Sequence, residues 1–311
     1  MPWTAADIPD LAGRTAVVTG ANSGIGYPTA LELARHGAQV VLACRDEGRG
    51  TAAVRRLTTE VPGARVELAA LDLADLASVR RFAESFSAAH PGLDLLVNNA
   101  GVMALPLRRT AEGFEMQFGT NHLGHFALTG RLLPQLLTRP GSRVVTVSSE
   151  THRMGRVDLT NLNAERSYRR WRAYAQSKLA NLLFTLELQR RAEAAGADLV
   201  AAAAHPGYAA TNLQTAGARM SGSRLRAQGA LLLNRLFGQP AEMGALPLLY
   251  AATNPTVRGG DYVGPVGRRG TRGHPGPAVT SERARDADIA GRLWEVSERL
   301  TGVRYEALSP A

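Results

Sequence analysis

The fold is decided by the stretch Thr15-Ala16-Val17-Val18-Thr19-Gly20-Ala21-Asn22-Ser23-Gly24-Ile25-Gly26. Its first five residues are aliphatic or β-branched and predict a buried strand, and the glycines after them predict a tight turn into a helix. Glycine lets the backbone approach a pyrophosphate, and the free N–H groups and dipole of a helix N-terminus attract such anions. Any strand-to-helix turn favours glycine, so this turn indicates a dinucleotide site only together with residues further along the chain.

The rest of the chain continues the alternation of strands and helices. In chain order the predicted elements are a strand at 15–19, a helix at 24–36, a strand at 39–43, a helix at 48–59, a strand at 65–70, a helix at 76–88, strands at 93–97 and 143–147, a helix at 168–194, strands at 199–203 and 261–263, and a helix at 286–300. Repeated βαβ units predict a parallel sheet with helices on both faces and ligands beyond the carboxyl ends of the strands. We therefore expect an α/β fold: one Rossmann-type, doubly wound domain over residues 1–311.

One segment departs from this pattern. Residues 207–239 mix Gly, Ser and Arg around the apolar run Leu231-Leu232-Leu233 and show no sheet periodicity. A segment of this length without regular elements is typical of a functional loop. We expect it to form a small mobile lid over a substrate.

Cysteine content and hydropathy predict the compartment. The single cysteine, Cys44, excludes an intrachain disulfide and any cysteine-based metal cluster, and fits a reducing compartment. The start, Met1-Pro2-Trp3-Thr4, lacks the basic and apolar regions of a signal peptide, and no apolar run approaches the roughly 20 residues that span a bilayer. We expect a soluble, cytoplasmic protein without an integral membrane segment.

The formal net charge of +9 raises the question of nucleic acid or an anionic membrane as partner. The arginines are scattered, however, and aromatic residues do not interleave with them as a base-stacking groove requires. A solvated, arginine-rich surface explains the charge, and we expect no nucleic-acid partner.

The chemistry is indicated by the only lysine. Among 36 lysine and arginine residues, Lys178 alone is a lysine, which suggests that its site needs an ammonium group and not a guanidinium. Tyr174 lies four residues earlier, so in a helix both side chains share one face. This is the spacing of a tyrosine acid/base and its lysine helper.

The second predicted strand ends in Cys44-Arg45. In dinucleotide-binding folds an acidic residue here holds the ribose hydroxyls of NAD, whereas an arginine suits the 2′-phosphate of NADP. Asp46 follows directly, so the assignment could shift by one residue. Arg45 predicts NADP(H), with NAD(H) as the less favoured alternative.

Together these motifs resemble those of the short-chain dehydrogenase/reductase family, in order and spacing, from about Gly13 to Gly264. The stretches that carry the resemblance are Thr19 to Gly26, Asn98-Asn99-Ala100-Gly101, Ser149, Tyr174-Ala175-Gln176-Ser177-Lys178 and Pro206-Gly207. Further stretches resemble the retinol dehydrogenase-like branch, which also includes WW-domain-containing oxidoreductases: Cys44-Arg45-Asp46, Asn121-His122-Leu123-Gly124-His125-Phe126, Val147-Ser148-Ser149 and Ser177-Lys178-Leu179-Ala180-Asn181.

The resemblance implies a role for each candidate residue. It implies four catalytic residues: Tyr174 as proton donor or acceptor, Lys178 on the nicotinamide ribose, Ser149 on the substrate oxygen, and Asn121 anchoring a water in the proton relay. It implies that Asp72 contacts adenine and that Thr211 contacts the diphosphate or carboxamide region. The full cofactor-binding set is Thr19, Gly20, Asn22, Ser23, Gly24, Ile25, Gly26, Arg45, Asp72, Leu73, Asn99, Ala100, Gly101, Tyr174, Lys178, Pro206, Gly207 and Thr211.

The acid/base role makes a demand on the pKa of Tyr174. A free tyrosine has a pKa of about 10, so work near neutral pH needs the pKa lowered by about 3 units. We expect the Lys178 ammonium and the positive nicotinamide ring of the oxidised cofactor to lower it.

Several competing residues are assigned structural roles. Tyr168 has Arg172 and not lysine four residues on, and is interpreted as a packed or surface aromatic. Ser148 and Ser149 point to opposite faces of an extended strand, so only one can serve, and the family pattern selects Ser149. His122 and His125 are interpreted as core or surface histidines, because no carboxylate or third histidine at suitable spacing completes a metal set, and His205 is interpreted as structural. We expect no metal site.

The sequence therefore predicts an NADP(H)-dependent alcohol dehydrogenase or carbonyl reductase for a mostly apolar small molecule, acting as a possible homo-oligomer. A protochlorophyllide reductase-like enzyme is a second enzymatic possibility. A cofactor-binding regulator with a lapsed site is the main alternative of another class, and the complete set Asn121, Ser149, Tyr174 and Lys178 argues against it.

Overall fold

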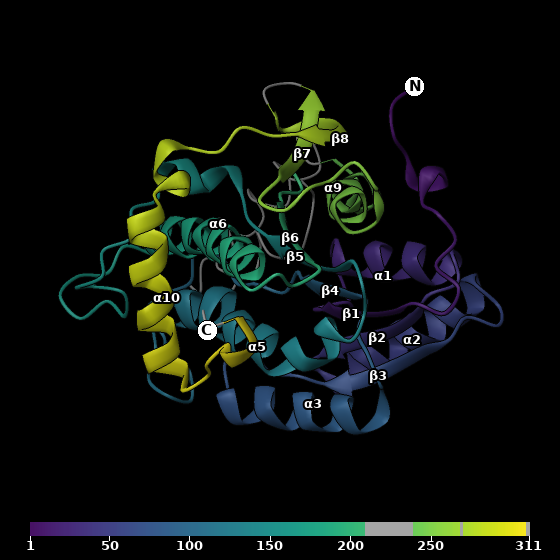
Figure 1. Ribbon diagram of the computed structural model, residues 1–311, viewed down its shortest axis with the longest axis horizontal. Coiled ribbons are helices and arrows are strands. Elements are labelled where there is room, and N and C mark those ends of the chain that lie inside the picture. Colours follow the sequence, from purple (N-terminus) through teal and green to yellow (C-terminus); the bar gives the residue numbers. More distant parts are fainter. Residues whose placement is uncertain (209–238, 268–269, 309–311) are drawn as a thin grey trace, which may run out of the picture.

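The structure is a computed structural model that describes residues 1–208, 239–267 and 270–308. Its centre is an eight-stranded sheet in the order β3-β2-β1-β4-β5-β6-β7-β8 (Figure 1). The strands are β1 (Thr15–Thr19), β2 (Gln39–Cys44), β3 (Val66–Ala70), β4 (Leu95–Asn98), β5 (Ser142–Val147), β6 (Leu199–Ala204), β7 (Tyr262–Gly267) and β8 (Arg272–Pro277). The chain crosses over between β3 and β4, so the sheet is wound outward in both directions from β1 and β4, as predicted.

Strands β1 to β7 are parallel to one another, and β8, at the edge of the sheet, is antiparallel. This last strand was not predicted from the sequence. The sheet was expected to close with a strand at 261–263, but β8 pairs antiparallel with β7, with Gly264 opposite Gly276 and Pro265 opposite Pro275. The sequence of β8, Arg-Gly-His-Pro-Gly-Pro, has no strand propensity. Proline, which lacks an N–H donor, is tolerated in an edge strand because one side of that strand needs no partner.

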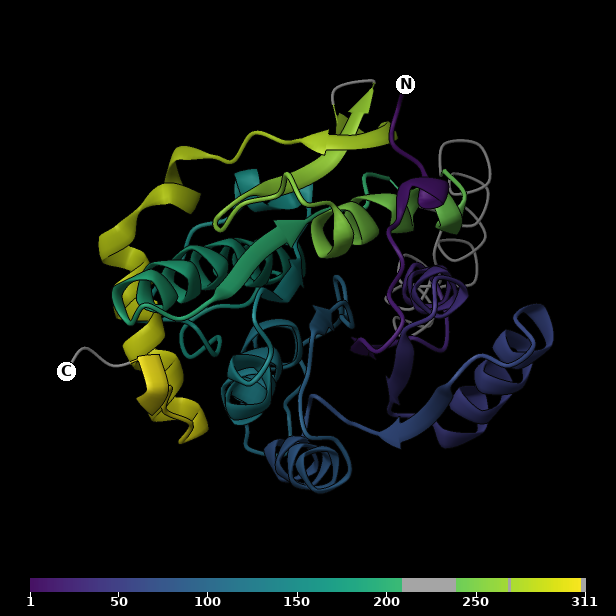
Figure 2. The same cartoon turned by 45° about the vertical axis from the view of Figure 1, so that its right-hand side comes forward.

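Helices cover both faces of the sheet (Figures 1 and 2). On one face, α1 (Gly26–Arg35), α2 (Glu47–Glu60) and α9 (Ala241–Thr253) share a core with Ala16 and Val18. On the other face, α3 (Leu76–Ala89), α5 (Gly124–Leu137) and α6 (Arg170–Ala194) share a core with Val17. Successive residues of β1 thus point to opposite faces and are all buried, which is why the strand reads as a continuous apolar run.

Short elements and a terminal helix complete the described chain. These are η1 (Ala5–Asp7), α4 (Met116–Phe118), the π-helical turn η2 (Gly119–Leu123), η3 (Glu150–Met154), η5 (Glu282–Arg285), α10 (Ala287–Thr301) and η6 (Glu306–Leu308). Within the described ranges, no helix is both long enough and apolar enough to cross a membrane.

Helix α10 lies against α6 and α5 (Figure 1). An aromatic cluster holds it there. The buried ring of Trp294 stacks on Phe184 with centroids 5.9 Å apart and meets Phe126 edge-on at 5.0 Å. Tyr305 lies 4.4 Å from the same indole and donates a hydrogen bond of 2.7 Å to the Phe126 carbonyl. These contacts anchor α10 on the outer side of the two helices that carry the candidate site.

We predict that Trp294→Ala lowers the free energy of unfolding by about 3–5 kcal/mol, because it leaves a cavity between three aromatic rings. Trp171→Ala is the matched control. Trp171 is 50% exposed on α6, so its loss should cost less than about 1 kcal/mol. Urea unfolding measures both values, and equal losses in the two variants would contradict this account of α10.

Candidate functional site

The glycine turn after β1 has the backbone shape that the sequence predicted. Gly20 has a φ of +67° and Gly24 a φ of +58°, values that L side chains rarely adopt. Gly26 is required for another reason, since a Cβ there would lie 2.5 Å from the Gly20 carbonyl oxygen. Helix α1 begins at Gly26 with Ile25 as its N-cap, and no side chain caps that end. Asn22 is partly exposed and Ser23 is exposed, so the turn reaches the surface beside the uncapped N-terminus of α1.

The Thr19 side chain joins this turn to the loop after β4. Its Oγ1 accepts hydrogen bonds of 2.9 Å from the backbone N–H groups of both Asn99 and Ala100. The Asn99 amide donates back to the Thr19 carbonyl at 2.7 Å. A Cβ built on Gly20 would lie 3.0 Å from Ala100 Cβ, so the two loops are in close contact. The sequence placed Thr19, Asn99, Ala100 and Gly101 in one site, and the structure brings them together.

At the end of β2, the structure gives Arg45 and Asp46 different environments. Asp46 is the N-cap of α2, accepts a hydrogen bond of 2.9 Å from the Arg49 N–H, and lies 3.5 Å from the Arg49 guanidinium. Arg45 is exposed and, within the described residues, has no ion-pair partner. The carboxylate is therefore occupied by the helix, while the guanidinium one residue earlier is available to a ligand.

Asp72 and Leu73 follow β3 at the same edge of the sheet. Asp72 accepts a hydrogen bond of 2.9 Å from the Ala74 N–H, which shapes the loop, and Leu73 is buried. Gly124, at the start of α5, allows this loop to pack against the helix, because a Cβ there would lie 2.4 Å from the Leu73 carbonyl oxygen. The predicted adenine-side residues thus lie at the carboxyl end of β3, packed against the start of α5.

Asn121 lies in the π-helical turn η2, and its side chain is fully used by the protein. Its Oδ1 accepts from the Val102 N–H at 2.8 Å, and its Nδ2 donates to the Val102 carbonyl and to Ser177 Oγ at 2.9 and 3.0 Å. Ser177 in turn donates to the Tyr174 carbonyl at 2.8 Å. The Asn121 side chain therefore fixes the β4 loop to α6, and only its backbone carbonyl remains to act in a relay.

The two serines after β5 separate as predicted. Ser148 is buried and donates a hydrogen bond of 2.8 Å to the Lys178 carbonyl, so its hydroxyl belongs to the packing of α6. Ser149 is partly exposed and is the N-cap of η3, with its Oγ 3.2 Å from the Thr151 N–H and 3.0 Å from Thr151 Oγ1. Ser149 also neighbours Tyr174 as a hydrogen-bonding group.

Tyr174 and Lys178 are both buried one turn apart on α6. The Lys178 ammonium lies 5.9 Å from the Tyr174 ring centroid and donates to the Val147 carbonyl at 2.9 Å. A Cβ built on Gly101 would lie 3.6 Å from Lys178 Nζ, which places the ammonium beside the β4 loop. The sequence-predicted pair therefore lies beside the β4 loop, which the Thr19 side chain joins to the glycine turn.

Electrostatics at this pair correct one expectation. Burial raises the pKa of Tyr174 to about 12, with the Ser149 hydroxyl acting weakly in the opposite direction. Burial also lowers the pKa of Lys178 to about 8, because no carboxylate compensates for the ammonium. The protein groups alone therefore do not lower the pKa of Tyr174 as the sequence argument expected; they hold it as a neutral phenol, the form that donates a proton.

Pro206 and Gly207 follow β6 at the same edge. Gly207 has a φ of +64°, and a Cβ there would lie 2.4 Å from the Thr271 carbonyl oxygen. Gln239 donates from its side chain to the Pro206 carbonyl at 2.7 Å and from its backbone to the Tyr208 carbonyl at 2.8 Å. Thr211 and the predicted lid between these ends lie outside the described residues.

The competing residues have structural partners. Tyr168 donates to the Leu105 carbonyl at 2.7 Å and accepts from Gln117 at 2.9 Å, so it is a packed aromatic, as expected. His122 lies 2.9 Å from Ser297 Oγ in α10. His205 is buried 3.3 Å from a Glu150 oxygen, and burial lowers its pKa to about 4. In the part of the chain that the structure describes, no group of three His, Cys, Asp or Glu side chains could hold a metal ion.

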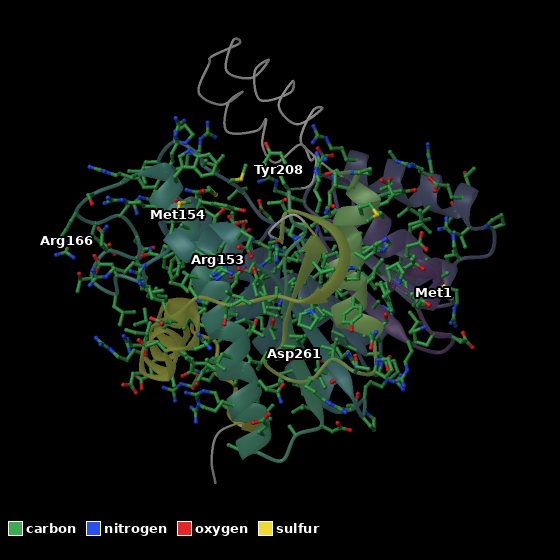
Figure 3. The ribbon with its side chains drawn as sticks, turned by 90° about the horizontal axis from the view of Figure 1, so that it is seen from above. Met1, Arg153, Met154, Arg166, Tyr208 and Asp261 are labelled. Carbon is green, nitrogen blue, oxygen red and sulfur yellow. The ribbon has the colours of Figure 1, made fainter. Side chains whose placement is uncertain are left out.

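The sequence argument missed Trp171, one turn before Tyr174 on α6. Its ring meets the Tyr174 ring edge-on with centroids 6.2 Å apart and is 50% exposed. Met154, at the end of η3, and Tyr208, after β6, are also large exposed residues, 68% and 38% exposed (Figure 3). Trp171 could have been found from the sequence, because residues three apart in a helix share a face and Tyr174 lies three residues later. The two others depend on loop conformation, which the sequence does not reveal.

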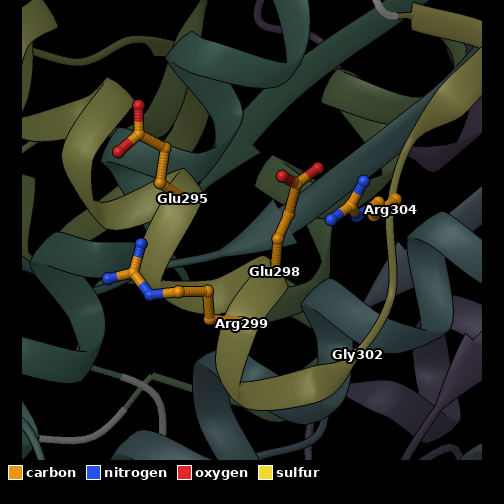
Figure 4. A pocket seen from close by; sticks show the side chains of 5 residues that line it. All are labelled: Glu295, Glu298, Arg299, Gly302 and Arg304. Atoms are coloured by element: carbon orange, nitrogen blue, oxygen red, sulfur yellow. The ribbon is translucent and has the colours of Figure 1, made fainter.

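A surface cavity of about 420 Å³ lies elsewhere, at the C-terminal end of α10 (Figure 4). Its lining residues are Glu295, Glu298, Arg299, Gly302 and Arg304. None of them belongs to the candidate site, and their charges are mixed.

The fold and this arrangement of a glycine turn, a serine, a tyrosine and a lysine define an NAD(P)-dependent oxidoreductase of the Rossmann type. Residues 14–221 match the short chain dehydrogenase family, and the chain belongs to that family. It is 45% identical to polyprenol dehydrogenase of Mus musculus over 95% of this chain and 86% of that protein. It is 40% identical to retinol dehydrogenase 12 of Homo sapiens over 95% of this chain and 89% of that protein. These relatives place it in the retinol dehydrogenase-like branch.

Solved structures agree with this assignment. An uncharacterized protein from Mycobacterium paratuberculosis is 49% identical, with a TM-score of 0.81 over 98% of this chain and 99% of that one. A structure from Beutenbergia cavernae, described as an NAD(P)-dependent gluconate 5-dehydrogenase with bound NADP, is 30% identical, with a TM-score of 0.59 over 79% of this chain and 91% of that one.

The neighbouring serines generate a prediction. Ser148→Ala should lower the free energy of unfolding by about 1 kcal/mol, because it removes a buried hydrogen bond to α6, and should leave much of the oxidoreductase activity. Ser149→Ala should have the opposite pattern: it should lower turnover about 100-fold or more and leave the free energy of unfolding nearly unchanged. Thermal unfolding and steady-state rates on the same preparations decide this; greater loss of activity in Ser148→Ala would contradict the assignment.

Proposed function

We propose that the protein is an NADP(H)-dependent oxidoreductase that transfers a hydride between nicotinamide and the carbonyl or alcohol group of a mostly apolar small molecule. The observation that carries the proposal is the grouping of Ser149, Tyr174 and Lys178 with the β4 loop, whose Ala100 packs against Gly20 of the glycine turn. The bound nicotinamide would supply or accept the hydride at its C4 carbon. The remaining steps fall to side chains of the chain itself.

Each of the three side chains has a distinct role in the proposal. The Ser149 hydroxyl holds the substrate oxygen by a hydrogen bond. The Tyr174 phenol gives its proton to that oxygen during reduction, and its neutral state in this buried site favours this direction. The Lys178 ammonium, already bonded to the Val147 carbonyl, has further donors for the ribose hydroxyls of the cofactor. Lysine provides these contacts as a compact point charge, whereas a guanidinium is broader and planar.

The glycine turn supports a dinucleotide as the cofactor. Gly20 and Gly26 leave no room for a side chain between the turn and the β4 loop, so the backbone itself lines the site. We assign Thr19, Asn22, Ser23, Gly24 and Ile25 to the pyrophosphate side, together with the N-terminus of α1. Asp72 and Leu73 are assigned to the adenine side, and Asn99, Ala100 and Gly101 to the ribose side.

The proposed preference for NADP(H) rests on Arg45. Its guanidinium is exposed at the end of β2, whereas Asp46 is engaged as the N-cap of α2 and would otherwise repel a phosphate. A free guanidinium forms charge-assisted hydrogen bonds with a doubly charged phosphate. The NADP-bound relative from Beutenbergia cavernae is consistent with this preference.

An apolar substrate is supported by the surface around Tyr174. Trp171 is exposed and contacts Tyr174, and the exposed Met154 and Tyr208 belong to the segments that follow β5 and β6. An exposed indole edge-on to the proposed acid provides an apolar wall for a substrate. The relatives named for polyprenol and retinol act on long apolar alcohols, which is the class we propose here.

We predict that the protein binds NADPH at least about 10-fold more tightly than NADH, and that Arg45→Asp reduces or inverts this ratio. Arg55→Asp is the matched control, because it makes the same charge change on an exposed arginine further along α2. Fluorescence titration with both nucleotides measures the ratio. Equal affinities of the wild type for NADPH and NADH would refute the role of Arg45.

The catalytic pair gives a prediction with a defined pH dependence. Lys178 has a lowered pKa of about 8, so its ammonium is present below pH 8 and is lost above it. The kcat/KM for NADPH should therefore be constant near pH 6–7 and fall as pH rises through about 8. Tyr174, with a pKa of about 12, should stay protonated over this range.

Two variants test the pair separately. Tyr174→Phe should lower kcat at least about 100-fold while NADPH binding, including its fall above pH 8, remains close to that of the wild type. Lys178→Arg should also lose most turnover, although its charge persists at every pH tested. Because Lys178 is the only lysine, an amine reagent can label only this side chain and the N-terminus, and NADPH should protect Lys178. Full activity in protein labelled at Lys178 would contradict the proposed mechanism.

A further inference from the structure

His125 is buried in the first turn of α5, between two parts of the candidate site. Its Nδ1 lies 3.0 Å from the Asn121 carbonyl oxygen, and its Nε2 lies 3.0 Å from Thr19 Oγ1. The imidazole therefore bridges the π-helical turn and the end of β1, two segments far apart in the sequence.

The partners fix the tautomer of this imidazole. A carbonyl oxygen only accepts hydrogen bonds, so Nδ1 carries the proton and donates to Asn121. In the neutral ring Nε2 is then an acceptor, and the Thr19 hydroxyl is the donor 3.0 Å from it. Thr19 Oγ1 already accepts from two backbone N–H groups, those of Asn99 and Ala100, and its proton has two acceptors in reach, His125 Nε2 at 3.0 Å and the Val97 carbonyl oxygen at 3.3 Å, of which the imidazole nitrogen is the nearer. Burial lowers the pKa of His125 to about 4, which agrees with a neutral ring.

The π-helical turn explains why a side chain is needed here. The Gly124 N–H bonds to the Gly119 carbonyl, five residues back, so the regular backbone pattern is interrupted at this point. The His125 side chain supplies a donor to the Asn121 carbonyl within the interrupted turn. The Asn121 side chain is already held by Val102 and Ser177, so His125 acts on the backbone carbonyl and not on the amide.

We propose that His125 is a positioning residue that holds the Asn121 carbonyl and the Thr19 hydroxyl in a fixed relation, and so couples the proton-transfer side of the site to the cofactor side. The proposal rests on the proposed function, because it assigns the two ends of the imidazole to different steps. The Nδ1 end orients the Asn121 carbonyl for a proton relay with Lys178. The Nε2 end orients Thr19, and through it the Asn99 and Ala100 backbone that borders the cofactor.

His122 is a natural control. It is equally buried, lies three residues earlier, in the π-helical turn η2, and bonds to Ser297 in α10 instead of to the site. A purely structural role for His125 would make the two histidines equivalent in every assay.

The experiment replaces each histidine by Asn and by Gln. An Asn amide reaches about as far as Nδ1, and a Gln amide about as far as Nε2, so each variant keeps one end of the bridge. His125→Asn should weaken NADPH binding about 10-fold and change kcat less than 3-fold. His125→Gln should lower kcat about 10-fold and leave the Kd for NADPH within about 2-fold. His122→Asn and His122→Gln should change neither quantity, whatever their effect on Tm.

A second measurement does not require turnover. Long-range ¹H–¹⁵N spectra of the imidazole rings should show His125 as the neutral Nδ1–H tautomer, assigned by the signal lost in His125→Gln. Thr19→Val removes the hydroxyl and should shift the His125 Nε2 signal while His122 stays in place. If the wild type fails to reduce any carbonyl with NADPH, the proposed function fails, but the tautomer and the NADPH affinities still judge the bridge.

Two results would overturn the proposal. One is an Nε2–H tautomer or a protonated His125 at neutral pH. The other is a parallel change of kcat and Kd in both His125 variants, in proportion to their loss of Tm and matched by the His122 variants.

Discussion

Parallel pairing of β1, β4, β5 and β6 is the constraint on which the rest of the molecule depends. The register sets Val18 beside Val97, Asn98 beside Thr146, and Val147 beside Ala204, so four strands end at one edge. Whatever follows each strand is thereby delivered to the same place: the glycine turn, the Asn99 loop, Ser149 and Pro206. Because the backbone groups of the sheet must pair, a site assembled from four distant segments follows from the same hydrogen bonds that stabilise the fold.

At that edge of the sheet, some polar side chains are fully hydrogen-bonded to the protein, and others remain accessible to a ligand. Thr19, Asn121 and Ser148 are saturated by protein partners, most of them backbone groups, and their loss would leave buried donors or acceptors unpaired. Ser149 and Arg45 retain access to a ligand. This division separates residues that shape the site from residues that touch a substrate or cofactor, a distinction that residue type alone does not make.

Burial governs the electrostatics of the acid/base pair. It opposes charge on both members, raising the pKa of Tyr174 and lowering that of Lys178, and the 5.9 Å between the ammonium and the phenol ring does not reverse this. The chain therefore presents a neutral phenol and an ammonium close to its titration point. A lysine poised in this way responds strongly to any new negative or hydroxyl group beside it, which is how a cofactor would alter the pair.

The sequence by itself determined the alternation of strands and helices, the glycine turn after residue 19, and the four-residue spacing of Tyr174 and Lys178. These features depend on local periodicity and backbone sterics, which neighbouring residues dictate. Only the tertiary structure decided that the proline-rich segment 272–277 is an edge strand and that His125 bridges Thr19 and Asn121. Each of these depends on a partner or a level of burial set by distant parts of the chain. Thr19 and His125 are 106 residues apart, and no local pattern encodes their contact.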